Sequence, residues 1–368
     1  MQKTKVMFCI PSLGNGGAEK FLVDLAGGLD RDRFEATVVC LWQPENAINE
    51  KRMREQNIDV IYLHKKQGFD FNLIKEMRKV VKAVKPDTVS THLNVLPYVI
   101  FSSIGIKNKY HTVHNLASRE IGGKYRYFVW LAYYVFGYTP VAISDTVKKS
   151  IEHDYKLRAE KIETIYNFVE TDKYFVKERR LKNTFDLVSF GRLTEQKNQK
   201  MMIRAVSTLV ERYPNIRLHI YGDGELKQEL QSFIGELKLE RNVILEGITD
   251  EVAKKLGESD IFLLSSLYEG LPISVLEAMS AGLPVVSTKA GGVVDVIKDD
   301  ENGFLIEQGD IGGFANAVEK LITDKNLYNK MSENSIKLSK KYDKSECIKQ
   351  YEALFAKKNI TSETAKNS

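Results

Sequence analysis

Two glutamates stand eight residues apart at the mouth of one expected helix. Glu269 lies in the loop before the helix, and Glu277 lies about a turn and a half inside it. Pro272 suits the first helical turn and Gly282 the C-terminal cap, so we expect the helix to run from about Pro272 to Ala281. Free N–H groups at a helix start attract phosphate, and carboxylates accept hydrogen bonds from hydroxyls. The stretch therefore favours a ligand with phosphates in its middle and hydroxyls at both ends, the shape of a nucleotide-diphosphate sugar.

Two cations follow another expected strand. The stretch SFGRLTEQKN (189–198) ends a strand at Gly191 and then places Arg192 and Lys197 five residues apart. The helix dipole disfavours positive charge at a helix start, so these side chains favour a clamp on two phosphates over a purely solvated face. Roles without a ligand stay open. Arg192 and Lys197 would then be solvated surface cations, and Glu277 would balance the helix dipole.

A glycine-rich stretch, PSLGNGGAEKF (11–21), follows the first expected strand and opens an amphipathic helix over 18–29. Gly16 and Gly17 allow the backbone to approach a ligand closely. Glu19 stands where a dinucleotide fingerprint has its third glycine, and no acidic residue ends the second strand, which argues against a nicotinamide or flavin site.

Two histidines, His92 and His114, each end an expected strand of the first half. A single histidine at a strand end is more often structural than catalytic. Two such residues at neighbouring strand ends make a functional role more credible than one would, and a structural role stays open.

Apolar runs alternate with helical periods along the whole chain, which predicts parallel βαβ units. Expected strands cover 6–10, 36–41, 60–63, 87–93, 110–115 and 139–144, then 185–191, 216–222, 242–247, 260–266 and 283–288. The alternation breaks in a polar stretch near 170–183. We therefore predict an α/β fold with two doubly wound Rossmann-like domains, 1–168 and 183–343, followed by a polar tail over 359–368.

Charge and composition limit the kinds of partner that the chain is expected to have. Residues 1–180 carry 29 Lys and Arg against 21 Asp and Glu, and residues 181–368 carry 25 against 28. A basic first half fits an anionic neighbour, either nucleic acid or phospholipid headgroups, although a solvated basic face explains the charge equally well. The helix expected over 124–136 is rich in aromatic residues with basic flanks, and it suits either a membrane surface or the core. Three scattered cysteines with no disulfide framework favour a reducing compartment. No apolar run approaches about 18 residues, so no membrane-spanning segment is expected.

The motifs together resemble family-four retaining glycosyltransferases with the GT-B fold. The match rests on the two glutamates of EGLPISVLE and on GNGGAE, TVHN, VAISDTVKKSI, GRLTEQKN and GGVVDVI, in the family's order and over nearly the whole chain. The stretch YEGLPISVLEAMSAGLPVV is most similar to members that build bacterial capsule, exopolysaccharide or lipid-linked glycans. One departure is IYNFVE (165–170), where Phe168 replaces a common glycine.

The resemblance implies a role for each matched residue in a central cleft between the two domains. Arg192 and Lys197 are expected to neutralise the leaving diphosphate, Glu277 to bind ribose hydroxyls and Glu269 to hold the donor sugar. The donor-binding set also includes Gly16, Gly17, Gly191, Gly270 and Leu271. His114 is expected to contact the donor sugar, and His92 lies on the acceptor side. The last helix, 344–358, is expected to cross back onto the first domain.

The function that follows is retaining, metal-independent transfer of a hexose or N-acetylhexosamine. The donor is expected to be a UDP-sugar and the acceptor a lipid-linked glycan, at the cytoplasmic face of the cell membrane in polysaccharide biosynthesis. No cofactor, metal or nucleic acid is expected. The alternatives are a small soluble acceptor, or a non-catalytic protein that binds nucleotide sugars.

Overall fold

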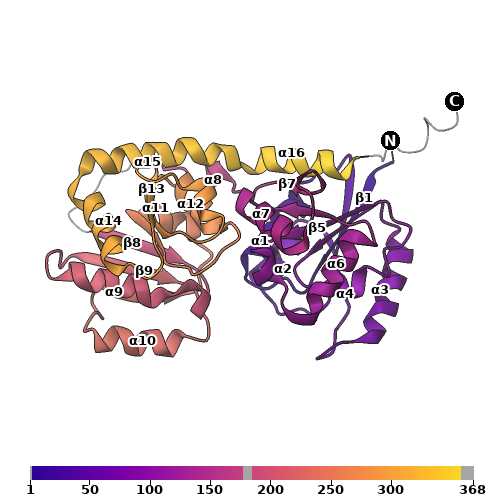
Figure 1. Cartoon of the computed structure of the whole chain (residues 1–368), viewed down its shortest axis with the longest axis horizontal. Coiled ribbons are helices and arrows are strands. Elements are labelled where there is room, and N and C mark those ends of the chain that lie inside the picture. Colours follow the sequence, from indigo (N-terminus) through magenta and orange to yellow (C-terminus); the bar gives the residue numbers. More distant parts are fainter. Residues whose placement is uncertain (1, 177–184, 358–368) are drawn as a thin grey trace. The chain divides into compact units, whose positions relative to one another are not determined.

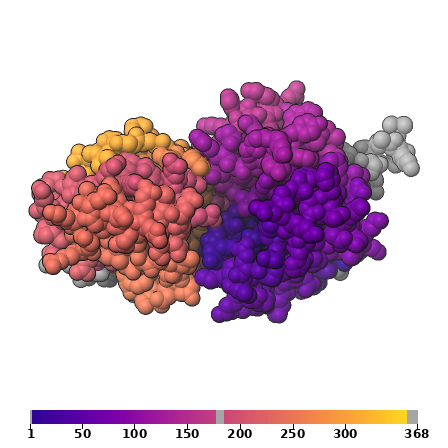
Figure 2. All heavy atoms as spheres, turned by 90° about the horizontal axis from the view of Figure 1, so that it is seen from below, coloured from indigo at the N-terminus to yellow at the C-terminus, as the bar shows by residue number. Residues whose placement is uncertain are grey.

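The computed structural model describes residues 2–176 and 185–357. The chain forms two compact units, Met1–Tyr166 with Ser345–Ser368, and Asn167–Lys344. Figure 1 traces their elements, and Figure 2 shows their surfaces with the colour running from indigo at the N-terminus to yellow at the C-terminus. The polar tail expected over 359–368 lies outside the described residues.

The first unit is built on a seven-stranded sheet in the order β3-β2-β1-β4-β5-β6-β7, with every pairing parallel. Its strands are β1 (Thr4–Ile10), β2 (Phe34–Cys40), β3 (Asp59–Tyr62), β4 (Thr88–His92), β5 (Asn108–Val113), β6 (Thr139–Ala142) and β7 (Glu163–Thr164). Its helices are α1 (Gly17–Gly28), α2 (Ile48–Glu55), α3 (Phe71–Val84), α4 (Leu96–Val99), α5 (Ala117–Glu120), η1 (Gly123–Tyr125), α6 (Arg126–Tyr134), α7 (Asp145–Tyr155) and η2 (Ala159–Lys161).

The second unit is built on a six-stranded parallel sheet in the order β10-β9-β8-β11-β12-β13. Its strands are β8 (Phe185–Phe190), β9 (Ile216–Tyr221), β10 (Val243–Gly247), β11 (Ile261–Leu264), β12 (Val285–Thr288) and β13 (Gly303–Ile306). Its helices are α8 (Thr171–Tyr174), η3 (Glu195–Lys197), α9 (Gln199–Val210), α10 (Lys227–Glu236), α11 (Val252–Glu258), α12 (Ile273–Ser280), α13 (Val293–Val296), α14 (Ile311–Thr323), α15 (Lys325–Ser339) and η4 (Lys340–Tyr342); α16 (Lys344–Phe355) follows.

Alternation along the strands explains how each sheet is covered on both faces. On β1, Met7 and Cys9 face a core that includes Leu73 and Met77 of α3. The intervening Phe8 contacts Phe355 of α16, with ring centroids 5.8 Å apart. Because helices bury both faces, the strands are continuous apolar runs, as in other parallel sheets.

The last helix belongs to the first unit, and specific hydrogen bonds hold it there. Glu352 accepts from the backbone N–H of Asp30 at 2.7 Å and from the Arg33 guanidinium at 2.9 Å. The Tyr110 hydroxyl donates to the carbonyl of Leu354 at 2.8 Å. The described part of α16 thus adds a layer to a sheet formed more than 200 residues earlier in the chain.

The predicted fold class is confirmed, with a doubly wound parallel sheet in each half of the chain. In such sheets a ligand site lies where the strand order reverses, at the carboxyl ends of the two central strands. The reversal falls between β1 and β4 in the first unit and between β8 and β11 in the second. Over the described residues, no helix is long and apolar enough to cross a membrane.

Candidate active site

Lys197 and Glu269 meet at the carboxyl ends of the adjacent strands β8 and β11. The Lys197 Nζ lies 2.5 Å from Glu269 Oε1, and the two side chains are only 17% and 8% exposed. A largely buried cation beside a carboxylate is a preorganised charge, and little solvent screens it. Two residues that the sequence analysis assigned to the same ligand are therefore in direct contact.

Backbone and side-chain hydrogen bonds join the loop after β8, which carries Lys197, to the loop after β11, which carries Glu269. The N–H of Leu267 donates to the carbonyl of Gln196 at 2.8 Å, and the Gln196 amide donates back to the carbonyl of Tyr268 at 2.9 Å. The Ser265 hydroxyl donates to the carbonyl of Lys197 at 2.9 Å. The position of the ammonium group is thus fixed from both ends of its loop.

Gly191 gives the Lys197 side chain its path along the end of β8. A Cβ added at Gly191 would lie 3.3 Å from Lys197 Cε, which is tighter than ordinary packing. Arg192 follows at once, but its exposed side chain forms no ion pair with any residue that the structure describes. The structure thus brings Lys197 to Glu269 and leaves Arg192 outside that contact.

A glycine pair in the next loop supports the stretch after Glu269. A Cβ on Gly291, whose φ is +52°, would lie 1.7 Å from the carbonyl oxygen of Glu269. The N–H of Gly292 donates to the carbonyl of Gly270 at 2.7 Å. The motif GGVVDVI therefore has a structural reason, because only glycine permits this approach of two backbones.

The helix after this loop begins close to the predicted residue. α12 runs from Ile273 to Ser280 with Pro272 as its N-terminal cap, against a predicted span of about Pro272 to Ala281. The N–H groups of Gly270 and Leu271 donate to no acceptor within residues 2–176 and 185–357. They are free to donate to a ligand at the start of α12.

Glu277 is buried and bonded to a residue that the sequence analysis did not single out. Its Oε1 accepts from the Tyr174 hydroxyl at 2.7 Å. The same segment also contributes Asn167, whose amide donates to the carbonyl of Leu271 at 2.6 Å, while Phe168 packs in the core. The ribose contact of Glu277 stays a prediction, and Tyr174 and Asn167 join the site as supporting residues.

The glycine-rich loop of the first unit lies at the carboxyl end of β1. Gly16 is the N-terminal cap of α1, and a Cβ there would meet Glu19 Oε2 at 2.2 Å. A Cβ on Gly17 would meet nothing within 4 Å. The atoms that a Cβ on Gly16 would meet belong to the flexible end of the Glu19 side chain, so packing alone requires glycine at neither position. The ligand contact expected of Gly16 and Gly17 stays a prediction.

The two strand-end histidines are hydrogen-bonded to each other. His92 Nδ1 lies 2.9 Å from His114 Nε2, and His92 is fully buried. Burial lowers the pKa of His92 well below its ordinary value and the pKa of His114 to about 3, so both rings are neutral at pH 7. In this arrangement His92 is covered, so the direct acceptor contact predicted for it would require the ring to be uncovered.

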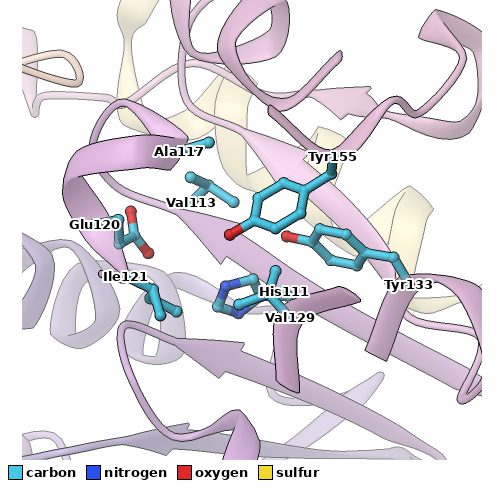
Figure 3. A pocket seen from close by; sticks show the side chains of 8 residues that line it. All are labelled: His111, Val113, Ala117, Glu120, Ile121, Val129, Tyr133 and Tyr155. Carbon is cyan, nitrogen blue, oxygen red and sulfur yellow. The ribbon is translucent and has the colours of Figure 1, made fainter. Parts of the chain in front are cut away.

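A small cavity lies behind the loop that carries His114. In Figure 3 the Glu120 carboxyl and the hydroxyls of Tyr133 and Tyr155 are directed into the same space beside the His111 ring. Glu120 Oε1 and the Tyr133 hydroxyl have no hydrogen-bond partner in the described structure. The other Glu120 oxygen accepts from the N–H of Asn115 at 2.7 Å, so this carboxyl also holds the His114 loop.

Glu120 is expected to make stability depend on pH, because desolvation raises its pKa from 4.5 to about 8. The unfolded carboxyl loses its proton first, so between these values the unfolded chain binds fewer protons than the folded chain. The free energy of unfolding therefore falls as pH rises from about 4.5 to about 8. Glu120→Gln keeps an acceptor for Asn115 and removes the charge.

We expect the melting temperature of Glu120→Gln, relative to wild type, to rise by a few degrees from pH 5 to pH 8.5. About 1 kcal/mol shifts a domain of this size by about 2–4 °C. Thermal denaturation at stepped pH measures the difference, with the exposed Glu160→Gln as control. A difference that is the same at every pH would show that Glu120 is ionised throughout.

Comparison with known proteins now identifies the class. The pattern described as "Glycosyltransferase Family 4" matches residues 15–173, and that described as "Glycosyl transferases group 1" matches residues 170–338. The UDP-Gal:alpha-D-GlcNAc-diphosphoundecaprenol alpha-1,3-galactosyltransferase of Escherichia coli is 31% identical over 72% of this chain and 75% of its own length. This chain belongs to the glycosyltransferases. An uncharacterized glycosyltransferase of Methanocaldococcus jannaschii is 37% identical over 59% of this chain and 60% of that relative.

A solved structure supports the GT-B fold of this glycosyltransferase. HepE from Anabaena, in complex with UDP and glucose, superposes with a TM-score of 0.82. The superposition covers 95% of this chain and 98% of HepE at 23% sequence identity. Both doubly wound sheets therefore have counterparts in this solved structure.

Proposed function

We propose that this glycosyltransferase transfers a hexose or N-acetylhexosamine from a UDP-sugar to a lipid-linked glycan acceptor, with retention of the anomeric configuration and without a metal. The observation that carries the proposal is the buried Lys197–Glu269 pair at the strand-order reversal of the second unit. The loops bring together a cation for the diphosphate, a carboxylate for the sugar hydroxyls, and the N–H groups of Gly270 and Leu271 for sugar or phosphate oxygens.

In the proposed reaction the bond between the sugar C1 and the diphosphate oxygen breaks. Lys197 and Arg192 stabilise the negative charge that develops on the departing UDP. The acceptor hydroxyl attacks C1 from the same face, and its proton passes to an oxygen of the leaving phosphate. Glu269 holds the sugar hydroxyls, and Glu277 holds the ribose.

The two cations offer the charge that a metal ion supplies in other transferases. Within the described residues, no group of three or more His, Cys, Asp or Glu side chains is arranged to hold a metal ion. Metal independence remains part of the proposal, and it is tested by turnover in the presence of EDTA.

The lipid-linked acceptor and the UDP donor are proposed from the relatives. The E. coli enzyme is named for UDP-Gal and a diphosphoundecaprenol-linked sugar, and it aligns over 291 residues. Two other relatives are named for glycan synthesis: LpsE of Rhizobium meliloti for lipopolysaccharide core biosynthesis, and AmsK of Erwinia amylovora for amylovoran biosynthesis. A role in capsule or exopolysaccharide synthesis at the inner face of the membrane fits these names.

An exposed aromatic surface on α6 supports contact with a lipid surface. Tyr127, Trp130 and Tyr134 share one helical face and are 61%, 43% and 45% exposed. Their rings stack in succession, with centroids 6.1 Å and 5.3 Å apart. Tyrosine and tryptophan with a flanking cation, here Lys124, are typical of the membrane–water interface.

The opposite face of α6 packs in the core. Val129, Ala132 and Tyr133 are buried, so the helix has one core face and one exposed face. We name the exposed set of Tyr127, Trp130 and Tyr134 the α6 aromatic face. Tyr133 is not part of it, so substitutions meant to test lipid binding belong on the α6 aromatic face.

Replacing Tyr127 and Trp130 together by serine is expected to weaken binding to phosphatidylglycerol-containing vesicles at least about tenfold. Burial of one large apolar side chain is worth about 1.5–3 kcal/mol, and 1.4 kcal/mol corresponds to a tenfold change. Vesicle co-sedimentation measures the effect, and Ile248→Ser, at an exposed apolar site of the second unit, is the control. Equal binding by both variants would remove the α6 aromatic face from any lipid contact.

The test of the whole proposal is calorimetric binding of a panel of UDP- and GDP-sugars, with UDP and GDP as controls. The bound donor is then offered to a polyprenyl-diphosphate-linked sugar, and NMR of the product reports the anomeric configuration. We expect one UDP-sugar to bind and to be transferred with retention. Binding of GDP-sugars alone would overturn the nucleotide, transfer only to small soluble acceptors would overturn the acceptor, and binding without transfer would favour a non-catalytic protein.

A further inference from the structure

A chain of hydrogen bonds runs from Ser90 through His92 to His114. The Ser90 hydroxyl lies 3.2 Å from His92 Nε2, and His92 Nδ1 lies 2.9 Å from His114 Nε2. Ser90 and His92 are fully buried on β4, and His114 directly follows β5. All three groups are neutral at pH 7, since burial lowers the pKa of both rings. A neutral chain of this kind has a definite direction, because each ring carries one proton.

The Ser90 hydroxyl sets that direction. Its proton needs an acceptor, and among the described residues its one partner is His92 Nε2. If Ser90 donates to Nε2, the proton of His92 must be on Nδ1, and Nδ1–H then donates to Nε2 of His114. The proton of His114 is consequently on its own Nδ1. That nitrogen has no partner among the described residues, and the ring is partly exposed.

Aromatic packing holds the two rings in this relation. Phe21 of α1 lies edge-on to His114 with centroids 5.2 Å apart, and it lies 6.1 Å from His92. Phe8 of β1 contacts His92 from another side at 6.1 Å. A ring flip of His92 would have to displace these phenyl rings in a close-packed core. Through Phe21, both histidines pack against α1, the helix that begins at the glycine-rich loop.

We propose that Ser90 and His92 are positioning residues that hold His114 as its Nδ1–H tautomer, so that His114 presents a hydrogen-bond donor to an oxygen of the bound substrate. The proposal rests on the proposed function for the substrate, but its structural part does not need one. A ring protonated on Nδ1 and bonded at Nε2 has no lone pair left to act as a base. This agrees with a reaction in which the leaving phosphate takes the acceptor proton.

The tautomers can be read directly by long-range proton–nitrogen NMR on the full chain labelled with 15N-histidine. The chain has 6 histidines, and His92→Asn and His114→Asn assign the two signal sets. We expect both rings to show the Nδ1–H pattern at pH 7. The reverse direction of the chain would put both protons on Nε2, so an Nε2–H pattern for His114 overturns the proposal.

A remote substitution separates positioning from simple packing. Ser90→Ala removes the donor without touching His114, and Ser90→Thr restores a hydroxyl at the same place. We expect Ser90→Ala to move the His114 nitrogen signals toward a mixture of tautomers and to lower kcat with the active UDP-sugar about tenfold, with little change in KM. Ser90→Thr should return both measurements toward wild type.

Unchanged His114 signals in Ser90→Ala would overturn the role of Ser90. The wild-type spectrum decides the direction of the chain even if Ser90→Ala fails to fold. Because the spectrum needs no substrate, an Nδ1–H pattern in a protein that binds no UDP-sugar would contradict the proposed function alone. An Nε2–H pattern in an active enzyme would contradict the tautomer proposal alone.

Discussion

Lys197→Ala is expected to lower turnover of the donor at least about a hundredfold. Removal of one preorganised group that stabilises developing negative charge costs about 10²–10³ in kcat. Lys197 is largely buried and its ammonium lies 2.5 Å from Glu269, so neither water nor another side chain easily replaces it. Release of UDP from the active UDP-sugar, measured with and without acceptor, gives kcat and KM separately.

The variant also leaves the Glu269 carboxylate buried without its partner, which destabilises the fold. The double variant Lys197→Met with Glu269→Gln removes both charges at similar volume. We expect it to recover the melting temperature and to remain inactive. Recovery of activity together with stability would assign Lys197 a structural role only.

Lys200→Ala is the matched control for charge. Lys200 lies three residues along on α9, forms an ion pair with Glu229 and packs over the Phe233 ring. We expect its turnover to stay within about twofold of wild type, because exposed ion pairs contribute about 0–1 kcal/mol. Equal losses in Lys197→Ala and Lys200→Ala would show that general positive charge, and not this site, supports the reaction.

The sequence predicts most of the fold because the central strands are fully buried. Of the thirteen strands within residues 2–176 and 185–357, eleven lie within a few residues of a predicted strand, and most of these are continuous apolar runs. The two missed strands are β7 (Glu163–Thr164) and β13 (Gly303–Ile306). Both lie at the edge of a sheet, and β7, with two residues, is too short to show a periodic pattern.

The candidate site is only partly predictable for a different reason. Residue types and helix signals place Lys197 and Glu269 at strand ends. The two residues are 72 positions apart in the chain, and their contact depends on the pairing of β8 with β11. The bond from Tyr174 to Glu277 spans 103 residues and comes from a segment whose composition is polar. Local sequence patterns do not predict contacts between residues so far apart, because these contacts depend on the order of the strands in the sheet.

The sequence also does not show which side of an aromatic helix faces the core and which faces solvent. On α6 aromatic residues occur on nearly every side, so composition alone suits both core and surface. Packing decides between them: Tyr133 stacks edge-on with Tyr155 in the interior, with centroids 5.4 Å apart, while Trp130 remains exposed. The three exposed rings of the α6 aromatic face are the part of this helix proposed to meet a lipid surface.

Gly291→Ala is expected to reduce both donor turnover and stability. The new Cβ would lie 1.7 Å from the carbonyl oxygen of Glu269, a distance that real Cβ atoms do not adopt. The obstacle is backbone, so one of the two loops must move, and the N–H of Gly292 would lose its acceptor on Gly270. The positions of Glu269, Gly270 and Leu271 depend on that contact. We therefore expect turnover to fall about a hundredfold, since misplacement of about 1 Å can cost that much.

Gly309→Ala separates this close approach from backbone strain. Gly309 has a φ of +83°, and a Cβ there would meet nothing within 4 Å. Alanine in the left-handed region costs about 1–2 kcal/mol, so Gly309→Ala should lower the free energy of unfolding by that amount and leave turnover unchanged. Gly291→Ala should lower it further. If the two variants lose equal stability and both keep their turnover, the Gly291 loop does not position Glu269, and the motif needs another explanation.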